Sequence, residues 1–271
     1  MALRHQVGWD PRFVERSAWF WPLAGAAERF AHLAEWPTRE ALDAMYRGLT
    51  AGVPGAPPLR FADNVRKEDK RRDGQIRLDG LYDGRIAVHG EVPTREGDWH
   101  DFFNALCFAT FPRSKRALHL RQYSALQGRV PATATRLPPT RTREQDALTL
   151  FDEGGALIAA ETPVYLQLSA AEGAEREALL RAFCEREQAR IVPFGHALFE
   201  HLVEGLRCPG GFTQLVAVER LAAPDPALLA QVDAALCALL ADPNRFQSPR
   251  AGSHLRLDVL GLWSNRRDVA S

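Results

Sequence analysis

The stretch GDWHDFFNALCFATFPRSK, residues 97–115, decides how the middle of this chain folds. Large aromatic side chains dominate it, and on an α-helix of 3.6 residues per turn they cover most of the circumference between residues 99 and 111. A helix that is apolar all round is normally buried. We therefore predict a buried helix at 99–111, with Asp98 as its N-cap. Asp101 takes the capping-box position, where helix-end chemistry alone explains an acidic side chain.

Two polar side chains interrupt this apolar helix. His100 and Asn104 lie one turn apart on the same line of its surface, and buried polar groups must find hydrogen-bond partners elsewhere in the fold. Two interpretations are open. In the first, both belong to a structural network, in which the amide holds a loop and the imidazole bonds a carbonyl. In the second, they belong to an active site or metal site, because buried titratable groups are where shifted pKa values arise.

A second polar pair lies on a helix that we predict from residue 193 and that a Pro-Gly-Gly run at 209–211 ends. His196 and Glu200, in GHALFEHL, are four residues apart at the edge of the apolar face. This spacing can present an imidazole and a carboxylate to one metal ion. It is also, and more commonly, the spacing of an ordinary ion pair along a helix. The HExxH pattern of zinc proteases is absent from the sequence, and the sequence has no Cys/His cluster.

A third group of acidic residues lies in DALTLFDEGGALIAAE, residues 146–161. We predict a β-hairpin here, because two apolar runs flank the DEGG segment at 152–155. Acidic residues before Gly-Gly suit a turn, so turn chemistry is the default explanation of Asp152 and Glu153. In the alternative interpretation, they and Asp146 are metal ligands or acid/base groups.

The remaining elements follow from apolar spacing and from end signals. Thr38 and Asp225 are predicted helix caps, Ser169 and Glu172 form a predicted capping box, and a turn at 83–84 precedes a short extended segment. The predicted helices span 22–36, 37–49, 113–126, 169–190, 193–211 and 225–242, and the predicted strands span 212–221 and 255–263, with an irregular connector at 128–142.

These elements have no regular βαβ rhythm and no internal repeat. We therefore predict the α+β class, as a single mixed domain of interspersed helices and short β-hairpins or strands over residues 1–271. Its N-terminal part, 1–58, is predicted to be helical, and 59–271 forms the main part that carries the motifs. A chain of this length can bury a sizeable core.

Composition places the chain in a broad class. Hydrophobic residues make up 46% and charged residues 25%, and 34 basic residues balance 34 acidic ones, which disfavours nucleic acid and excludes a membrane surface as the expected partner. The N-terminus lacks the apolar run of a secretory signal, and no apolar stretch is long enough to span a bilayer. Four scattered cysteines indicate reduced thiols. We expect a cytoplasmic location.

Further motifs and charge runs narrow the function. The sequence has no Walker A motif, no GxGxxG after a strand and no GxSxG elbow, which disfavours nucleotide-driven chemistry and the common serine-hydrolase plan. The basic run from Arg66 to Arg77 mixes signs and lacks aromatic residues, so we expect a solvated loop. An RNA-associated role for this run is a third possibility, which requires strongly salt-dependent binding.

Three segments in order, 99–115, 146–155 and 194–200, resemble the bacterial family known as domain of unknown function 3025. The similarity runs from about Tyr82 to near the C-terminus. It implies a cytoplasmic bacterial protein and brings no established activity with it. The resemblance indicates the positions to examine, which are His100, Asp101, Asn104, Asp146, Thr149, Asp152, Glu153, His196 and Glu200.

The leading hypothesis is an enzyme of hydrolase type with its site between the 99–111 and 195–205 helices. In the metal-dependent form, His100, His196, Glu200 and Asp152 bind a divalent metal ion.

The catalytic residues in this hypothesis are His100, Asn104, Asp152 and Glu153. Asp152 or Glu153 completes the metal shell or acts as general base, and Asn104 orients substrate or water. In a metal-free form His100 is the acid/base group.

The alternative is a non-catalytic binding or regulatory protein, with a small-molecule or protein partner, in which these polar residues are structural. A separation above roughly 10 Å between His100 and both His196 and Glu200 would exclude shared coordination.

Overall fold

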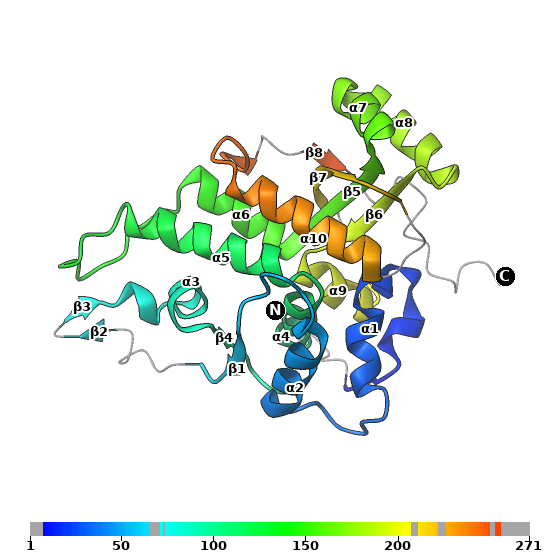
Figure 1. Ribbon diagram of the computed structural model, residues 1–271. Coiled ribbons are helices and arrows are strands. Elements are labelled where there is room, and N and C mark those ends of the chain that lie inside the picture. The colour runs from blue at the N-terminus through cyan, green and yellow to red at the C-terminus, as the bar shows by residue number, and fades with distance from the viewer. Residues whose placement is uncertain are drawn as a thin grey trace.

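The computed structural model describes residues 8–64, 71–72, 74–206, 211–221, 226–249 and 253–255, and the structural statements below concern these residues. Helices form most of this part and short strands lie between them, which confirms the predicted α+β class (Figure 1). No helix in these ranges combines the length and the apolar character that crossing a membrane requires.

The elements are labelled in chain order. The α- and 3-10 helices are η1 (Phe13–Arg16), η2 (Ala18–Leu23), α1 (Ala24–Ala27), η3 (Glu28–Phe30), α2 (Arg39–Thr50), η5 (Leu78–Gly80), α3 (Tyr82–Gly84), α4 (Trp99–Thr110), α5 (Pro112–Gln127), α6 (Arg143–Gly154), α7 (Thr162–Ala170), α8 (Gly173–Glu185), α9 (His196–Val203) and α10 (Pro226–Ala241), and η6 (Arg85–His89) is a π-helix. The strands are β1 (Arg60–Ala62), β2 (Arg71–Arg72), β3 (Gln75–Ile76), β4 (Glu91–Pro93), β5 (Gly155–Glu161), β6 (Ala189–Pro193), β7 (Gly211–Val218) and β8 (Ser253–Leu255).

A four-stranded sheet of order β6-β5-β7-β8 organises the second half of the chain. Strand β5 is central: it pairs antiparallel with β6, where Ala156 faces Pro193, and parallel with β7, where Gly155 faces Phe212. Every residue of β5 except Glu161 is buried, as expected of a strand covered on both faces. Helices α5, α6 and α10 lie together beside this sheet, and α7 and α8 extend beyond the end of β5 (Figure 1).

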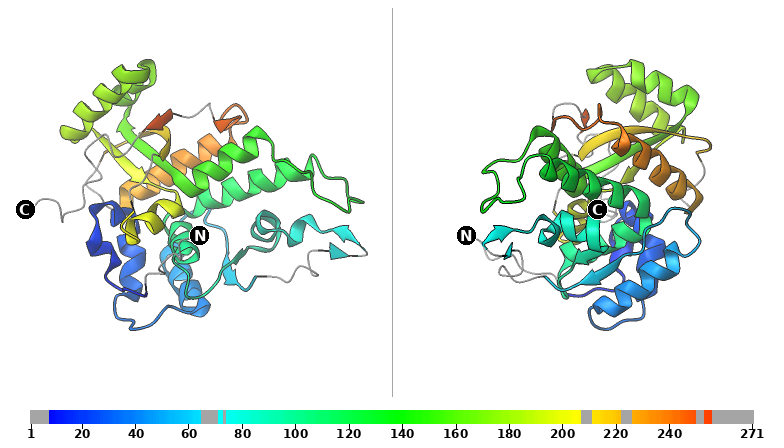
Figure 2. Two further views of the ribbon diagram at one scale, coloured as in Figure 1. Left: turned by 180° about the vertical axis from the view of Figure 1, so that it is seen from behind. Right: turned by 60° about the vertical axis from the view of Figure 1, so that its left-hand side comes forward.

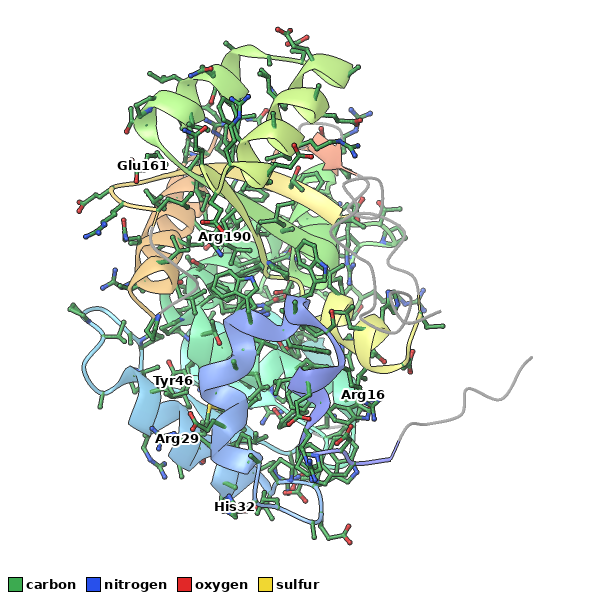
Figure 3. All side chains as sticks on the ribbon, turned by 90° about the vertical axis from the view of Figure 1, so that its right-hand side faces the viewer. Arg16, Arg29, His32, Tyr46, Glu161 and Arg190 are labelled. Atoms are coloured by element: carbon green, nitrogen blue, oxygen red, sulfur yellow. The ribbon has the colours of Figure 1, made fainter. Side chains whose placement is uncertain are left out.

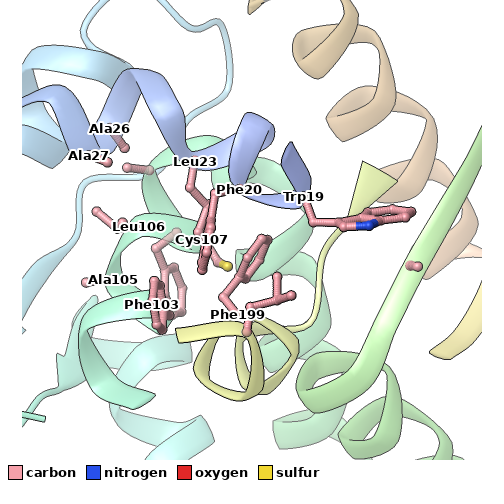
Figure 4. Close-up of a cluster of buried hydrophobic side chains, with 14 of the residues drawn as sticks. Trp19, Phe20, Leu23, Ala26, Ala27, Phe103, Ala105, Leu106, Cys107 and Phe199 are labelled. Atoms are coloured by element: carbon pink, nitrogen blue, oxygen red, sulfur yellow. The ribbon is translucent and has the colours of Figure 1, made fainter. Parts of the chain in front are cut away.

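Helix α4 lies in a second hydrophobic core that the N-terminal segments complete. The Phe103 ring packs on Phe20 of η2 and Phe199 of α9, with centroid distances of 5.7 and 5.9 Å (Figure 4). Trp99 stacks on Phe103 at 5.2 Å. Aromatic contacts of this kind add to the free energy of burying apolar area. The contact between Phe103 and Phe199 packs α4 against α9, and this packing sets the distance between the polar residues on the two helices.

A side view shows the sheet above the N-terminal helices. Glu161, at the end of β5, lies in the upper part of the molecule below α7 and α8, and Arg29, after α1, lies in the lower part (Figure 3). Seen from behind, α5 and α6 run side by side, and the loop that joins them lies near β2 and β3 (Figure 2). There the amide of Ile76 donates to the carbonyl of Ala134 at 2.8 Å.

The predicted hairpin at 146–161 is wrong. Residues up to Gly154 belong to helix α6, which Thr142 and Gln145 open with a capping box, and β5 begins at Gly155. Ala147, Leu148 and Phe151 recur at helical spacing and are buried in the core, whereas Leu150 is exposed. A Cβ at Gly155 would lie 2.3 Å from the carbonyl oxygen of Phe151, so the change from helix to strand requires glycine at that position.

Other boundaries also differ from the predictions. The turn expected at 83–84 is helix α3, and the extended segment after it, β4, begins only at Glu91. Ser169 lies inside α7, and Glu172 is the N-cap of α8. The helix expected at 22–36 is divided into short 3-10 and α-helical segments, and α9 ends at Val203, before the Pro-Gly-Gly run.

Several predictions are confirmed. Asp98 caps α4 by accepting from the amide of Asp101, Thr38 caps α2, and α5 covers the helix expected at 113–126, with Pro112 in its first turn. Strand β7 and helix α10 also lie where expected. The expected Asp225 cap, most of the 255–263 strand, and residues 66–70 and 73 of the basic run lie outside the described residues.

Candidate functional site

Three chain segments that are far apart in sequence meet at one polar cluster. His100 lies in the first turn of α4, Glu153 in the last turn of α6, and His196 begins α9. Their ligand-type atoms all lie within 4.8 Å of one another. The Nε2 atoms of His100 and His196 are 3.0 Å apart, and Oε2 of Glu153 lies 3.6 Å from Nε2 of His196. Two imidazole nitrogens and one carboxylate oxygen therefore converge on one point.

Gly195 explains why α9 can begin so close to the end of α6. A Cβ at this position would lie 2.4 Å from the carbonyl oxygen of Glu153 and 2.5 Å from the amide nitrogen of Gly155. Real Cβ atoms do not approach backbone that closely. The absence of a side chain at Gly195 thus permits the contact that brings His196 to the acidic end of α6.

Each histidine of the cluster has a carboxylate near its other ring nitrogen. Nδ1 of His100 lies 2.9 Å from Oε2 of Glu200, and Nδ1 of His196 lies 3.9 Å from Oδ2 of Asp152. The first distance is a hydrogen bond and the second is a longer electrostatic contact. A carboxylate behind a histidine favours the proton on the nitrogen that faces it, which leaves the lone pair of Nε2 directed at the cluster.

The surroundings shift the pKa values of these groups in different directions. The hydrogen bond that His100 donates to Glu200 raises the pKa of His100 against the opposing effect of burial. Burial lowers the pKa of His196 to about 3, although Asp152 opposes this change. His196 is therefore neutral at ordinary pH and offers a lone pair. Burial also raises the pKa of Glu153, with the nearby His100 opposing.

Exposure indicates from which side the cluster can be reached. The side chain of His196 is 4% exposed, whereas those of His100 and Glu153 are 30% and 44% exposed. Solvent and a ligand can therefore approach past His100 and Glu153, and His196 forms the floor. The cluster is thus open to solvent on one side and buried on the other.

The other residues singled out in the sequence lie outside this convergence. Asn104 donates through Nδ2 to the Tyr82 hydroxyl at 2.7 Å, and its Oδ1 is buried with no hydrogen-bond partner in the described part of the chain. Asp101 accepts from the amide and the guanidinium of Arg95, at 2.7 and 2.8 Å, so its side chain binds the segment before the helix and not, as a capping box requires, the amide of Asp98.

Asp146 and Thr149 also lie apart from the cluster. Both are on α6, where Asp146 is exposed and Thr149 donates to the carbonyl of Gln145 at 2.8 Å. Neither is among the residues that converge with His100.

Two buried basic residues on α5 were missed. Lys115 is fully buried and its ammonium pairs with Asp152, and His119, one turn later, is 2% exposed. In the sequence RSKRALH, both residues look like parts of a solvated basic face. Their spacing of four residues on a predicted helix was the one available signal, and it says nothing about which side of the helix is buried.

Comparisons with known proteins identify a family and no activity. A family model described as "Protein of unknown function (DUF3025)" matches residues 71–269, a span that contains the whole cluster and confirms the resemblance seen in the sequence. No curated protein and no solved structure matches the chain.

Proposed function

This chain belongs to the DUF3025 family, and we propose that it is an enzyme of hydrolase type that binds one divalent metal ion through His100, His196 and Glu153. The observation that supports this proposal is the convergence of their ligand atoms within 4.8 Å, with a carboxylate near the far nitrogen of each histidine. A bacterial origin and a cytoplasmic location belong to the same proposal.

The donor set decides which ions fit. Two neutral imidazoles and one carboxylate suit Zn²⁺ or another divalent first-row metal, whereas Mg²⁺ and Ca²⁺ favour oxygen donors. Catalytic zinc sites keep three protein ligands and leave further positions open. Because His100 and Glu153 are partly exposed, the open positions would face solvent. An ion held there supplies Lewis acidity and activates water near neutral pH.

The carboxylates take different positions relative to this centre. We assign the third ligand to Glu153, because Oε2 of Glu200 is already at Nδ1 of His100, on the far side of that ring. Glu200 then orients His100, and Asp152 orients His196. Both positioning carboxylates strengthen the donor character of the nitrogen opposite them.

Elemental analysis of untagged protein, purified without chelator and reconstituted with Zn²⁺, tests the proposal. We expect about one ion per chain in the wild type and its loss in His100→Ala and His196→Ala, because each variant removes one of three donors. His201→Ala is the matched control, since it removes a histidine from the same helix α9.

Circular dichroism and melting curves establish that each variant is folded. A wild-type protein that stays metal-free after reconstitution contradicts the proposal, as does full metal content in both histidine variants. In the first case, the contact between His100 and His196 would function without metal, as an acid/base pair or as a structural network.

A further inference from the structure

Lys115 occupies a place that is costly for a lysine. Its side chain is fully buried, its ammonium pairs with Oδ1 of Asp152, and it lies 4.8 and 5.8 Å from the ring centroids of Phe108 and Phe194. Removing an ammonium from water is unfavourable unless a partner charge compensates. A well-packed apolar pair at such a position is often as stable as the ion pair. Folding stability alone therefore does not explain this charge.

His119 holds a fixed orientation one turn further along α5. Its ring stacks on Phe108 with a centroid distance of 5.5 Å and an interplanar angle of 15°, and it meets the Tyr82 ring edge-on at 5.5 Å. Nδ1 lies 2.8 Å from Oδ1 of Asp83. The ring therefore has an aromatic neighbour on one face, a second in edge-on contact and a carboxylate at Nδ1, and Nε2 lies 3.9 Å from Oδ2 of Asp152.

Asp152 connects Lys115 and His119 to His196, one of the proposed metal ligands. Its Oδ2 lies 3.9 Å from Nε2 of His119 and 3.9 Å from Nδ1 of His196. Both nitrogens are buried, and neither has a hydrogen-bond partner within bonding distance in the described residues. Buried polar groups are rarely left without partners. A small closing movement, or one bridging water, completes both contacts to the same oxygen.

We propose that Lys115 and His119 are positioning residues that hold Asp152 behind His196 and so fix the ring of His196 with Nε2 toward the metal centre. This inference rests on the proposed metal site for its role, although the orientation itself exists without metal. Lys115 keeps Oδ1 in place, and His119 keeps Oδ2 turned toward the shared gap. Neither residue contacts the metal or the substrate.

The first test uses metal-free protein, in which the imidazole nitrogens are labelled with ¹⁵N. Nitrogen chemical shifts and long-range couplings distinguish a proton on Nδ1 from one on Nε2 in each histidine. We expect wild-type His196 to carry its proton on Nδ1. In His119→Phe, which keeps the ring packing on Phe108, and in Asp152→Asn, which keeps the shape, we expect a mixture of the two tautomers.

The second test measures Zn²⁺ affinity by competition with a chromophoric chelator. Loss of a group that orients a ligand histidine typically weakens metal binding about 10–100-fold. We expect this loss in His119→Phe at nearly unchanged melting temperature. Asp152→Asn should show the same loss with a lower melting temperature, because it leaves the Lys115 ammonium buried without a partner charge. Lys115→Met is the harsher variant, because it leaves Asp152 buried without its partner, and the His119 variant keeps the test valid if Lys115→Met does not fold.

The outcomes separate this inference from the proposed function. A proton on Nε2 of His196 in the wild type, or an unchanged tautomer in both variants, overturns the positioning role whether or not metal binds. If the wild type binds no Zn²⁺ but the tautomer changes in the variants as expected, the positioning network stands and the metal site fails. Weaker Zn²⁺ binding with an unchanged tautomer would show a packing effect and would also overturn the inference.

Discussion

Glu153 and Glu200 take different positions at the proposed site, and this difference predicts how much each one contributes to Zn²⁺ affinity. In Glu200→Gln the amide oxygen can still accept from Nδ1 of His100, so the ring keeps its orientation and one negative charge is lost. Across an imidazole, about 6 Å from a divalent ion, one unit of charge amounts to about 1.4 kcal/mol at the dielectric constant of water. That is tenfold in affinity, and partial burial moves the loss toward the hundredfold end of the usual range.

Glu153→Gln should weaken Zn²⁺ binding much more. It removes the charge from an oxygen that belongs to the converging ligand atoms and replaces an anionic ligand by a poor neutral one. We expect a loss above about 100-fold, the upper limit usual for a group behind a ligand. The Glu153 side chain is 44% exposed, so the fold should tolerate the change.

Chelator competition at neutral pH, with melting temperatures recorded for each variant, measures both effects. Glu204→Gln, at the C-cap of α9 and one turn beyond Glu200, is the control for general charge loss and should bind Zn²⁺ like the wild type. A larger loss of Zn²⁺ affinity in Glu200→Gln than in Glu153→Gln would refute the assignment, because it would indicate that Glu200 binds the ion and Glu153 does not.

Three predictions concern the fold. Gly195→Ala should lower the melting temperature and weaken metal binding, since its Cβ would meet backbone at 2.4 Å, whereas Gly154→Ala meets nothing within 4 Å and should change neither. Glu91→Gln should destabilise the protein by roughly 1–2 kcal/mol at pH 7, because burial raises the pKa of Glu91 but Arg85 and Arg60 together outweigh burial and lower it. That difference should begin to shrink as the pH falls below about 4.5, where the Glu91 carboxylate of the unfolded chain gains its proton, and it is lost once the pH falls below the lowered pKa of the folded protein. Urea unfolding at pH 7 and 3.5 measures it, and a constant difference would contradict the prediction. Asp233→Ala should cost about 1.5–3 kcal/mol in the same assay, because the carboxylate accepts from backbone amides at the start of α5; a loss below 0.5 kcal/mol, the usual range of surface substitutions, would argue against that cap.

Local sequence information predicted α4 well. Its apolar circumference indicated burial, and its cap at Asp98 is a contact between residues three apart. The same kind of information failed at residues 146–161, because Asp-Glu-Gly-Gly satisfies both a turn and the end of a helix. There the capping box at Thr142 and the burial of Phe151 decide for the helix.

The geometry of the polar cluster could not be predicted from any single segment, because it depends on how separate segments pack together. The sequence pointed to His100 and to the pair of His196 and Glu200, since polar residues on apolar helices stand out. It did not show which carboxylate faces which nitrogen, because that follows from the angle at which α9 packs on α4. Lys115 was missed for the same reason: its burial depends on the neighbours of α5 and not on its own helix.

The sequence by itself determined helices α4 and α9, the Asp98 cap and the apolar faces that bury both helices, because hydrogen bonds and periodicity act over a few residues. It did not determine α6, which carries Glu153. The meeting of His100 with His196, whose positions differ by 96, was decided by tertiary packing. Aromatic contacts between α4 and α9 and the missing Cβ of Gly195 set a separation of 3.0 Å between the two ring nitrogens. Such a distance results from the packing of whole helices, and no local pattern specifies it.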